Sequence, residues 1–253
     1  MVKWIIAVLV IVILGASVFT GIHYYKQGKD AADALARSLK RKDISITVVE
    51  GKRREEIATE LENKGITSAK DFLAASSGVE GTLFPDTYRF FPNTSASDVV
   101  SKMQENFNTK TASLNLTRDQ LILASIVERE ASGDSERATI AGVYNNRLKI
   151  NMKLEADPTT QYAKDTLAYQ ANPDSTFQFW GVITVADYQG VHSPFNTYTV
   201  EGLPPGPICN PGIKSIEAAI NPETNPYYYF VHKNGQLLLA KTLAQHNQQV
   251  NGK

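Results

Sequence analysis

The sequence predicts an α+β fold, with a helical region beside a small sheet. The helical part rests on residues 121–127, a nearly unbroken apolar run that follows Thr117 and Gln120. These two polar residues have the spacing of a capping box, so a helix begins there, and its apolar character on all sides predicts burial. The sheet rests on Asn234 and Gly235, which separate two apolar segments and are typical turn residues of a β-hairpin.

The composition is that of an ordinary globular protein, with 42% hydrophobic and 21% charged residues. The 253 residues suffice for one large domain or two small ones. Lys and Arg together number 26, as do Asp and Glu, so no basic excess favours nucleic acid as a partner. Cys209 is the single cysteine, which excludes an intramolecular disulfide, and we expect it to be structural.

Motifs typical of metal and cofactor sites are absent from the sequence. It contains no H-E-x-x-H, no cysteine pair for zinc, no P-loop and no G-x-G-x-x-G. The S-x-x-K and G-x-S-x-G patterns of serine nucleophiles are absent as well. We therefore expect neither a metal nor a cofactor, and we interpret the four scattered histidines as surface or hydrogen-bonding residues.

The amino-terminal segment predicts a transmembrane anchor over residues 1–26. Residues 4–25 are almost wholly apolar and uncharged, which is about the length that spans a bilayer as a helix. Trp4 and Tyr24 lie near its ends, where aromatic belts occur. A cleaved signal peptide is the alternative, although the apolar run is long for one. Residues 27–43 are charged and rich in alanine, and predict a helical stalk.

A small β-α-α unit is predicted next. Residues 44–49 alternate and are rich in β-branched side chains, which indicates a strand. Helical spacing predicts a helix over residues 53–63 and a shorter one from residue 67 or 68 to residue 75. A unit of about 35 residues is too small for a deep core, so it must pack on the rest of the chain or serve as a small binding module.

The remaining sequence is mainly helical in pattern. Helices are predicted over residues 97–107, 118–133, 134–148, 158–169, 214–220 and 242–250. Residues 171–196 are rich in aromatics, proline and glycine and have no confident assignment, although residues 177–185 could form strands. Residues 202–207 cannot form regular structure because of their prolines and glycines.

Glu128 is the leading candidate for chemistry, because it ends the apolar helix. Desolvation there would disfavour its charged form, and a carboxyl group held protonated is the general acid that glycosidic bond cleavage needs. The alternative is that Glu128 merely marks where the helix reaches solvent. Polar and aromatic residues suited to carbohydrate, each of which could equally be structural, are Tyr144, Asn145, Asn146, Asp157, Tyr162, Asn196 and Tyr198.

Several segments together resemble the YceG-like family of endolytic murein transglycosylases. They are EGTLFPDTY (80–88), LASIVERE (123–130), DPTTQY (157–162), SPFNTY (193–198) and GLPPGPICNPG (202–212), and the similarity extends over about residues 44–248. The resemblance implies a small LysM-like unit at residues 44–79 and a mixed helical and sheet catalytic domain at residues 80–253. It further implies Glu128 as the catalytic residue and, as candidates for substrate binding, Glu80, Tyr88, Asn145, Asn146, Asp157, Thr159, Asn196 and Tyr198.

The implied activity is non-hydrolytic cleavage of the β-1,4 bond between N-acetylmuramic acid (MurNAc) and N-acetylglucosamine (GlcNAc) within nascent peptidoglycan strands. Glu128 would protonate the leaving oxygen and then accept the proton of the sugar's own C6 hydroxyl, giving a 1,6-anhydroMurNAc end and terminating glycan elongation. The domain would then be extracytoplasmic, held by a single pass in a bacterial cell membrane, near glycan-polymerising complexes. The alternatives are a non-catalytic peptidoglycan-binding scaffold and a muramidase that uses water.

Overall fold

The computed structural model describes residues 19–31, 42–174 and 176–252, and the chain divides into two units after Asp43. In the first unit, residues 19–31 are helical and exposed. Most of the predicted membrane span and much of the predicted stalk lie outside the described residues. Within the described ranges, no helix is both long and apolar enough to cross a membrane.

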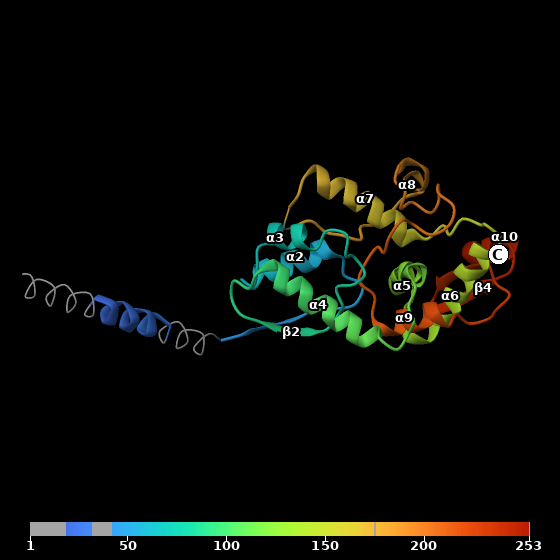
Figure 1. The fold of residues 1–253 in the computed structure, drawn as a ribbon. Helices are drawn as coiled ribbons and strands as arrows, with labels where there is room; N and C mark the ends of the chain where they lie inside the picture. The colour runs from blue at the N-terminus through green and yellow to red at the C-terminus, as the bar shows by residue number, and fades with distance from the viewer. Residues whose placement is uncertain (1–18, 32–41, 175, 253) are drawn as a thin grey trace, which may run out of the picture. The chain divides into compact units, whose positions relative to one another are not determined.

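The second unit combines helices with two small antiparallel sheets, which is the α+β class that the sequence predicts (Figure 1). Its elements are, in chain order, β1 (Ile44–Thr47), α2 (Arg54–Asn63), α3 (Ala69–Ala75), β2 (Thr87–Phe90), α4 (Ala96–Thr111), α5 (Arg118–Glu130), α6 (Asp134–Lys149), α7 (Asp157–Ala171), α8 (Val185–Gly190), α9 (Ile213–Ile220), β3 (Tyr229–Lys233), β4 (Gln236–Ala240) and α10 (Leu243–Asn251).

The first sheet joins two strands that are far apart in the sequence. Strand β1 pairs antiparallel with β2, with Ile44 opposite Phe90. Strand β2 is not among the elements that the sequence predicts. Side chains from this sheet and from α2, α3 and α4 share one hydrophobic cluster, which reaches Met103. The boundary proposed between residues 79 and 80 falls within this cluster, and the division into a LysM-like unit and a catalytic domain stays a prediction.

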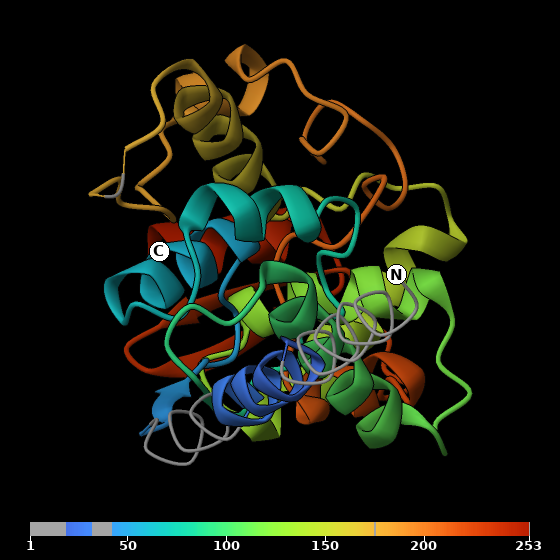
Figure 2. The same ribbon diagram turned by 60° about the vertical axis from the view of Figure 1, so that its left-hand side comes forward.

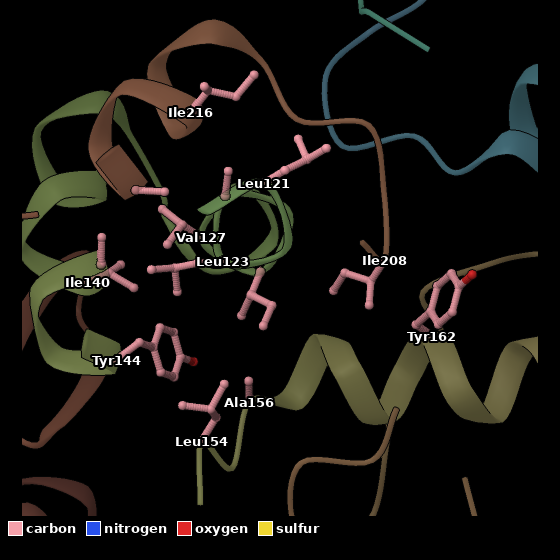
Figure 3. Close-up of a cluster of buried hydrophobic side chains, with 14 of the residues drawn as sticks. Leu121, Leu123, Val127, Ile140, Tyr144, Leu154, Ala156, Tyr162, Ile208 and Ile216 are labelled. Carbon is pink, nitrogen blue, oxygen red and sulfur yellow. The ribbon is translucent and has the colours of Figure 1, made fainter. Parts of the chain in front are cut away.

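Helix α5 is the centre of the second hydrophobic cluster. The predicted capping box is confirmed: the Thr117 hydroxyl accepts a hydrogen bond from the Gln120 amide, and the Gln120 side chain accepts one from the Thr117 amide at 2.9 Å. Seven consecutive residues of α5 are buried because α6, α7 and α9 pack around it. Figure 3 shows α5 end-on, surrounded by side chains that include Ile140 of α6 and Ile216 of α9.

The predicted hairpin is confirmed, with β3 and β4 joined by a two-residue turn. Asn234 has φ of 54° and Gly235 has φ of 74°. A turn of type I′ requires positive φ at both central residues, and asparagine and glycine tolerate this best. Helix α10 packs on both strands of the hairpin.

The strands suggested for residues 177–185 are wrong. The described part of this segment holds no strand, and α8 follows it. Phe177 and Phe179 pack against Tyr169 of α7, with ring centroids 5.6 and 5.3 Å away. The backbone then turns at Trp180, which has φ of 65°. The aromatic residues therefore reflect packing onto α7, and α7 and α8 lie together at the top of both ribbon views (Figures 1 and 2).

Candidate functional site

Two glutamates lie at the carboxyl end of α5, and they face different surroundings. Glu128 and Glu130 are two residues apart, which on an α-helix directs their side chains roughly 200° apart. Both glutamates contact α6, but Glu128 faces the start of α9 and the turn after β1, whereas Glu130 faces the start of α7. The sequence analysis singled out Glu128 alone.

Glu128 is held by donors at both carboxylate oxygens. Its Oε1 accepts a hydrogen bond from Arg137 Nη1 at 3.1 Å, and its Oε2 accepts one from the Gly212 amide at 2.9 Å. The side chain is 6% exposed. The predicted burial of the Glu128 side chain is confirmed. The sequence indicated apolar surroundings, but the carboxylate is bound by a cation and a backbone donor. An ion pair of this kind is a common structural feature at a buried helix end.

Arg137 and Glu50 complete the surroundings of Glu128. The Arg137 guanidinium also donates to Ser215 Oγ at 2.6 Å and to Asp134 at 3.1 Å. The Glu50 carboxylate occupies the space in which a side chain on Gly212 would lie. Partial burial raises the pKa of Glu50, and the charge of Glu128 raises it further. Glu50 could not be predicted from the sequence, because its contact with Gly212 joins segments about 160 residues apart in the chain.

Glu130 borders a cavity of about 500 Å³. Burial raises the pKa of this carboxyl group to about 7, and the charge of Asp157 contributes to the rise. The Tyr144 hydroxyl donates to Glu130 Oε1 at 2.7 Å, and this hydrogen bond opposes the rise, as do the charges of His232 and Arg147. A carboxyl group with a pKa near neutrality can both donate and accept a proton, which suits a general acid and base.

The cavity has aromatic walls and polar groups on several sides. Asp157 accepts a hydrogen bond from the Tyr198 hydroxyl at 2.6 Å, and the Tyr198 ring stacks on Tyr188 with centroids 4.0 Å apart and planes at 16°. Such a combination of ring faces and hydrogen-bonding groups suits carbohydrate. The other lining residues are Arg147, Leu154, Glu155, Tyr229, Phe230, Val231, His232, Leu243, His246, Asn247 and Val250.

Arg147 of α6 stabilises the part of the cavity wall where α6 meets the β3–β4 hairpin. Its Nη1 donates to the Leu154 carbonyl and its Nε donates to the Tyr228 carbonyl, each at 2.6 Å. Its guanidinium also lies 5.0 Å from the centre of the Tyr229 ring, which stacks on His246. Burial lowers the pKa of His246, and the charge of Arg147 lowers it further.

The predicted substrate-binding residues lie in several different surroundings, and only two of them line the cavity beside Glu130. Asp157 and Tyr198 meet in the cavity beside Glu130. Asn145 borders a different cavity, of about 620 Å³, between α5, α6 and α9. Asn146 donates to the backbone carbonyls of Asn225 and Tyr227, so it supports the segment before β3.

The others are engaged inside the fold. Tyr88 is 4% exposed and donates to the Phe84 carbonyl at 2.6 Å. Thr159 and Asn196 are fully buried; Thr159 bonds the Ala156 carbonyl, and the Asn196 amide donates to the Tyr188 and Val191 carbonyls. These contacts support structural roles, although Asn196 also positions the α8 segment that carries Tyr188.

Glu80 belongs to a buried polar network that the loop over residues 202–212 holds together. Glu80 accepts hydrogen bonds from the Arg54 amide and from Asn210 Nδ2, and burial raises its pKa well above the usual range. Asn210 Oδ1 accepts from the Gly81 and Leu83 amides, each at 2.9 Å. The loop therefore connects the first sheet's unit to α5, and Cys209 within it is fully buried.

No group of three or more His, Cys, Asp or Glu side chains within the described ranges could hold a metal ion. The acidic and histidine side chains around Glu130 instead bind protein partners, such as the pair of His232 with Glu136 at 2.9 Å.

Comparisons with known proteins identify the family of this chain. The model of the YceG-like family matches residues 6–252. The chain is 38% identical over 183 residues to a Bacillus subtilis protein named endolytic murein transglycosylase, and 30% identical over 182 residues to a Streptococcus pneumoniae protein of the same name. These matches cover 67% and 68% of this chain but 46% and 32% of the relatives, so the chain spans less than half of their length.

A crystal structure gives the same result for the fold. A yceG-like protein of Listeria monocytogenes superposes with a TM-score of 0.69 and is 28% identical in sequence. The match covers 81% of this chain and 75% of that protein. The resemblance noted in the motifs is thus confirmed, and the chain belongs to the YceG-like family.

Proposed function

We propose that this protein is an endolytic murein transglycosylase whose general acid and base is a glutamate at the carboxyl end of α5, with Glu128 the residue that the sequence predicts and Glu130 the residue that the cavity favours. It cleaves the MurNAc–GlcNAc β-1,4 bond within glycan strands and leaves 1,6-anhydroMurNAc ends. The observation that carries the proposal is a carboxyl group with a pKa of about 7 at the edge of an aromatic cavity of about 500 Å³. The names of the relatives from Bacillus subtilis and Streptococcus pneumoniae support the reaction.

Access distinguishes Glu130 from Glu128. Both oxygens of Glu128 accept hydrogen bonds from protein donors, and its side chain is 6% exposed. Each of these oxygens keeps one further acceptor site, so Glu128 is not closed to a ligand by its two donors. Glu130 instead borders a cavity that can hold a sugar, with Tyr144 bound to one of its oxygens. Glu128 remains the prediction from the sequence, and the same experiment tests both.

The proposed reaction needs no separate nucleophile. The glutamate donates its proton to the glycosidic oxygen as the bond from that oxygen to C1 breaks. The C6 hydroxyl of the same sugar then attacks C1, and its proton passes to the glutamate carboxylate. Because the nucleophile belongs to the substrate, the rate gains from proximity and no water has to be positioned. The raised pKa of Glu130 suits both steps, since the group must give and regain a proton near neutral pH.

We also infer the cellular setting. The apolar, uncharged residues 4–25 favour a transmembrane anchor over residues 1–26, and a glycan substrate requires the rest of the chain to be extracytoplasmic, in a bacterial cell envelope. The β1-α2-α3 unit, with β2 paired to β1, favours a LysM-like, glycan-binding role for residues 44–79. Cleavage within nascent strands would terminate their elongation and bring the protein near glycan-polymerising complexes.

The test is mass spectrometry of uncrosslinked glycan strands incubated with the full chain in detergent micelles. We expect internal fragments with anhydroMurNAc ends from the wild type, and a loss of roughly 10²–10⁴-fold in rate for whichever of Glu128→Gln and Glu130→Gln removes the acid. Glu105→Gln, an exposed change on α4, is the matched control and should cleave normally. If Glu128→Gln is inactive in a folded protein while Glu130→Gln cleaves, the acid is Glu128, and the reverse result identifies Glu130.

The second candidate function is a muramidase that uses water. It is favoured by the carboxyl groups of Glu130, Glu155 and Asp157 in one cavity, since glycoside hydrolases generally use a pair. Reducing ends in the wild-type products would identify this reaction and exclude the transglycosylase. Strands that are retained by the protein but not cut would instead indicate a non-catalytic peptidoglycan-binding scaffold.

A further inference from the structure

Arg129 lies between the two glutamates at the end of α5, and its side chain is exposed. Its guanidinium stacks on the Trp180 ring, with Cζ 4.0 Å from the ring centre. Among the residues that the structure describes, none forms a hydrogen bond or an ion pair with this guanidinium. Arg137 and Arg147, by contrast, each donate to several protein oxygens. Arg129 therefore presents a positive charge at the surface that the described chain does not pair with a carboxylate.

Trp180 is fixed by contacts from two helices. Its amide donates to Asp165 of α7 at 2.5 Å, and its indole nitrogen donates to Glu56 of α2 at 2.8 Å. The backbone at Trp180 has φ of 65°, a region that bulky residues rarely adopt. Such a conformation persists only where the surrounding structure holds it, and it is frequent at ligand sites. The ring is therefore a fixed platform for the guanidinium of Arg129.

The turn after β1 brings this cation close to Glu128. A side chain on Gly51 would meet Arg129 Nη1 at 3.2 Å and Glu128 Cγ at 3.6 Å, so both side chains lie against the same point of the backbone. The Gly51 amide donates to the Asn210 carbonyl at 3.0 Å, which fixes the turn. Glu128 forms its ion pair with Arg137 and not with Arg129. A ligand that reaches Glu128 would therefore lie next to the guanidinium of Arg129.

We propose that Arg129, stacked on Trp180, is a subsite for a carboxylate of the peptide that MurNAc carries, beside the glycosidic bond that is cut. This inference rests on the proposed function. A guanidinium presents a planar fork of N–H donors that matches a carboxylate, and stacking on a ring leaves the edge of that fork free. The sugars of an intact strand are neutral where the peptide is attached, so the carboxylates of the peptide are the anions available to such a cation. Binding there would position the MurNAc at the end of α5, and no covalent bond forms with Arg129.

The test measures kcat/KM of the full chain in detergent micelles for two substrates. One is uncrosslinked glycan strands with their peptides, and the other is the same strands after their carboxylates are converted to amides. The wild type should cut the native strands roughly 10-fold more efficiently, as expected for a charge-assisted hydrogen bond. Arg129→Gln should cut both substrates equally well, because it removes the cation and retains both glutamates. The preference of the wild type should also shrink as the salt concentration is raised.

Lys102→Gln is the matched control. Lys102 is also an exposed cation over an aromatic ring, 5.0 Å from the centre of Phe90, but it lies on α4. Its loss removes the same charge and should leave the preference for native strands unchanged. Trp180→Leu removes the platform and retains the charge of Arg129, and should weaken the preference roughly 3-fold.

Two results would overturn the inference while the proposed function stands, provided that anhydroMurNAc ends are formed. One is a wild type that cuts both substrates equally well, and the other is an Arg129→Gln protein that keeps the wild-type preference. Reducing ends, with the preference lost in Arg129→Gln, would refute the transglycosylase and support the subsite. A wild type that cuts neither substrate would refute both.

Discussion

Glu128 and Glu130 are the same residue type on the same helix, and the fold gives them opposite settings. Glu128 is paired with Arg137 and the Gly212 amide beside a second carboxylate, Glu50. Glu130 lies at a cavity with a tyrosine hydroxyl as its donor, and its pKa rises to about 7. The first arrangement joins α5 to α6 and α9. The second leaves a titrating carboxyl group next to space for a ligand.

The comparison shows that burial alone does not identify a catalytic acid. Both glutamates follow the buried stretch of α5. Glu128 forms an ion pair with Arg137 at 3.1 Å, whereas burial raises the pKa of Glu130 despite the opposing charges of His232 and Arg147.

The largest effect on stability should come from breaking the Glu128 pair. Glu128→Gln leaves the guanidinium of Arg137 without its buried carboxylate, and we expect the free energy of unfolding to fall by roughly 3 kcal/mol. Urea denaturation at pH 7 measures this, with Glu105→Gln as the control. A change below about 1 kcal/mol would mean that Glu128 is not primarily a structural partner, and would strengthen its claim to catalysis.

Glu130→Gln should instead raise the free energy of unfolding, and only at higher pH. The folded-state pKa of Glu130 is raised. Its contribution to the stability of the fold is therefore complete below about pH 4.5 and is lost as pH rises through about 7. The glutamine does not titrate, so the variant should exceed the wild type in stability by up to about 3 kcal/mol at pH 8.5 and by much less at pH 5. Equal pH dependence in both proteins would contradict the raised pKa.

The smallest effect should come from Tyr144→Phe, and it should appear in the pH dependence of cleavage activity. The Tyr144 hydroxyl lowers the pKa of Glu130 through its hydrogen bond, so its removal should raise that pKa. The loss of cleavage activity at alkaline pH should then shift to higher pH. Rates measured from pH 6 to 9 decide this, and an unchanged alkaline limb would show that Glu130 does not control it.

Several features of this protein follow from short stretches of its sequence. The capping box at Thr117, the apolar run behind it and the turn at Asn234 and Gly235 are local signals, and each formed as predicted. The motif segments also identified the family, because their order and length are specific. Local hydrogen bonds and hydrophobic periodicity need no information about the rest of the chain, which is why these features can be predicted.

The site depended on contacts between distant segments. Strand β2 exists because it pairs with β1 about 43 residues earlier, and Glu50 meets Gly212 across about 160 residues. Asp157 and Tyr198 were predicted as separate candidates, and the fold made them a hydrogen-bonded pair. The partners that distinguish Glu130 from Glu128 come from α6, α9 and the cavity walls. The electrostatic environment of a carboxyl group is the sum of such partners, and only the tertiary structure decides which of them lie within reach.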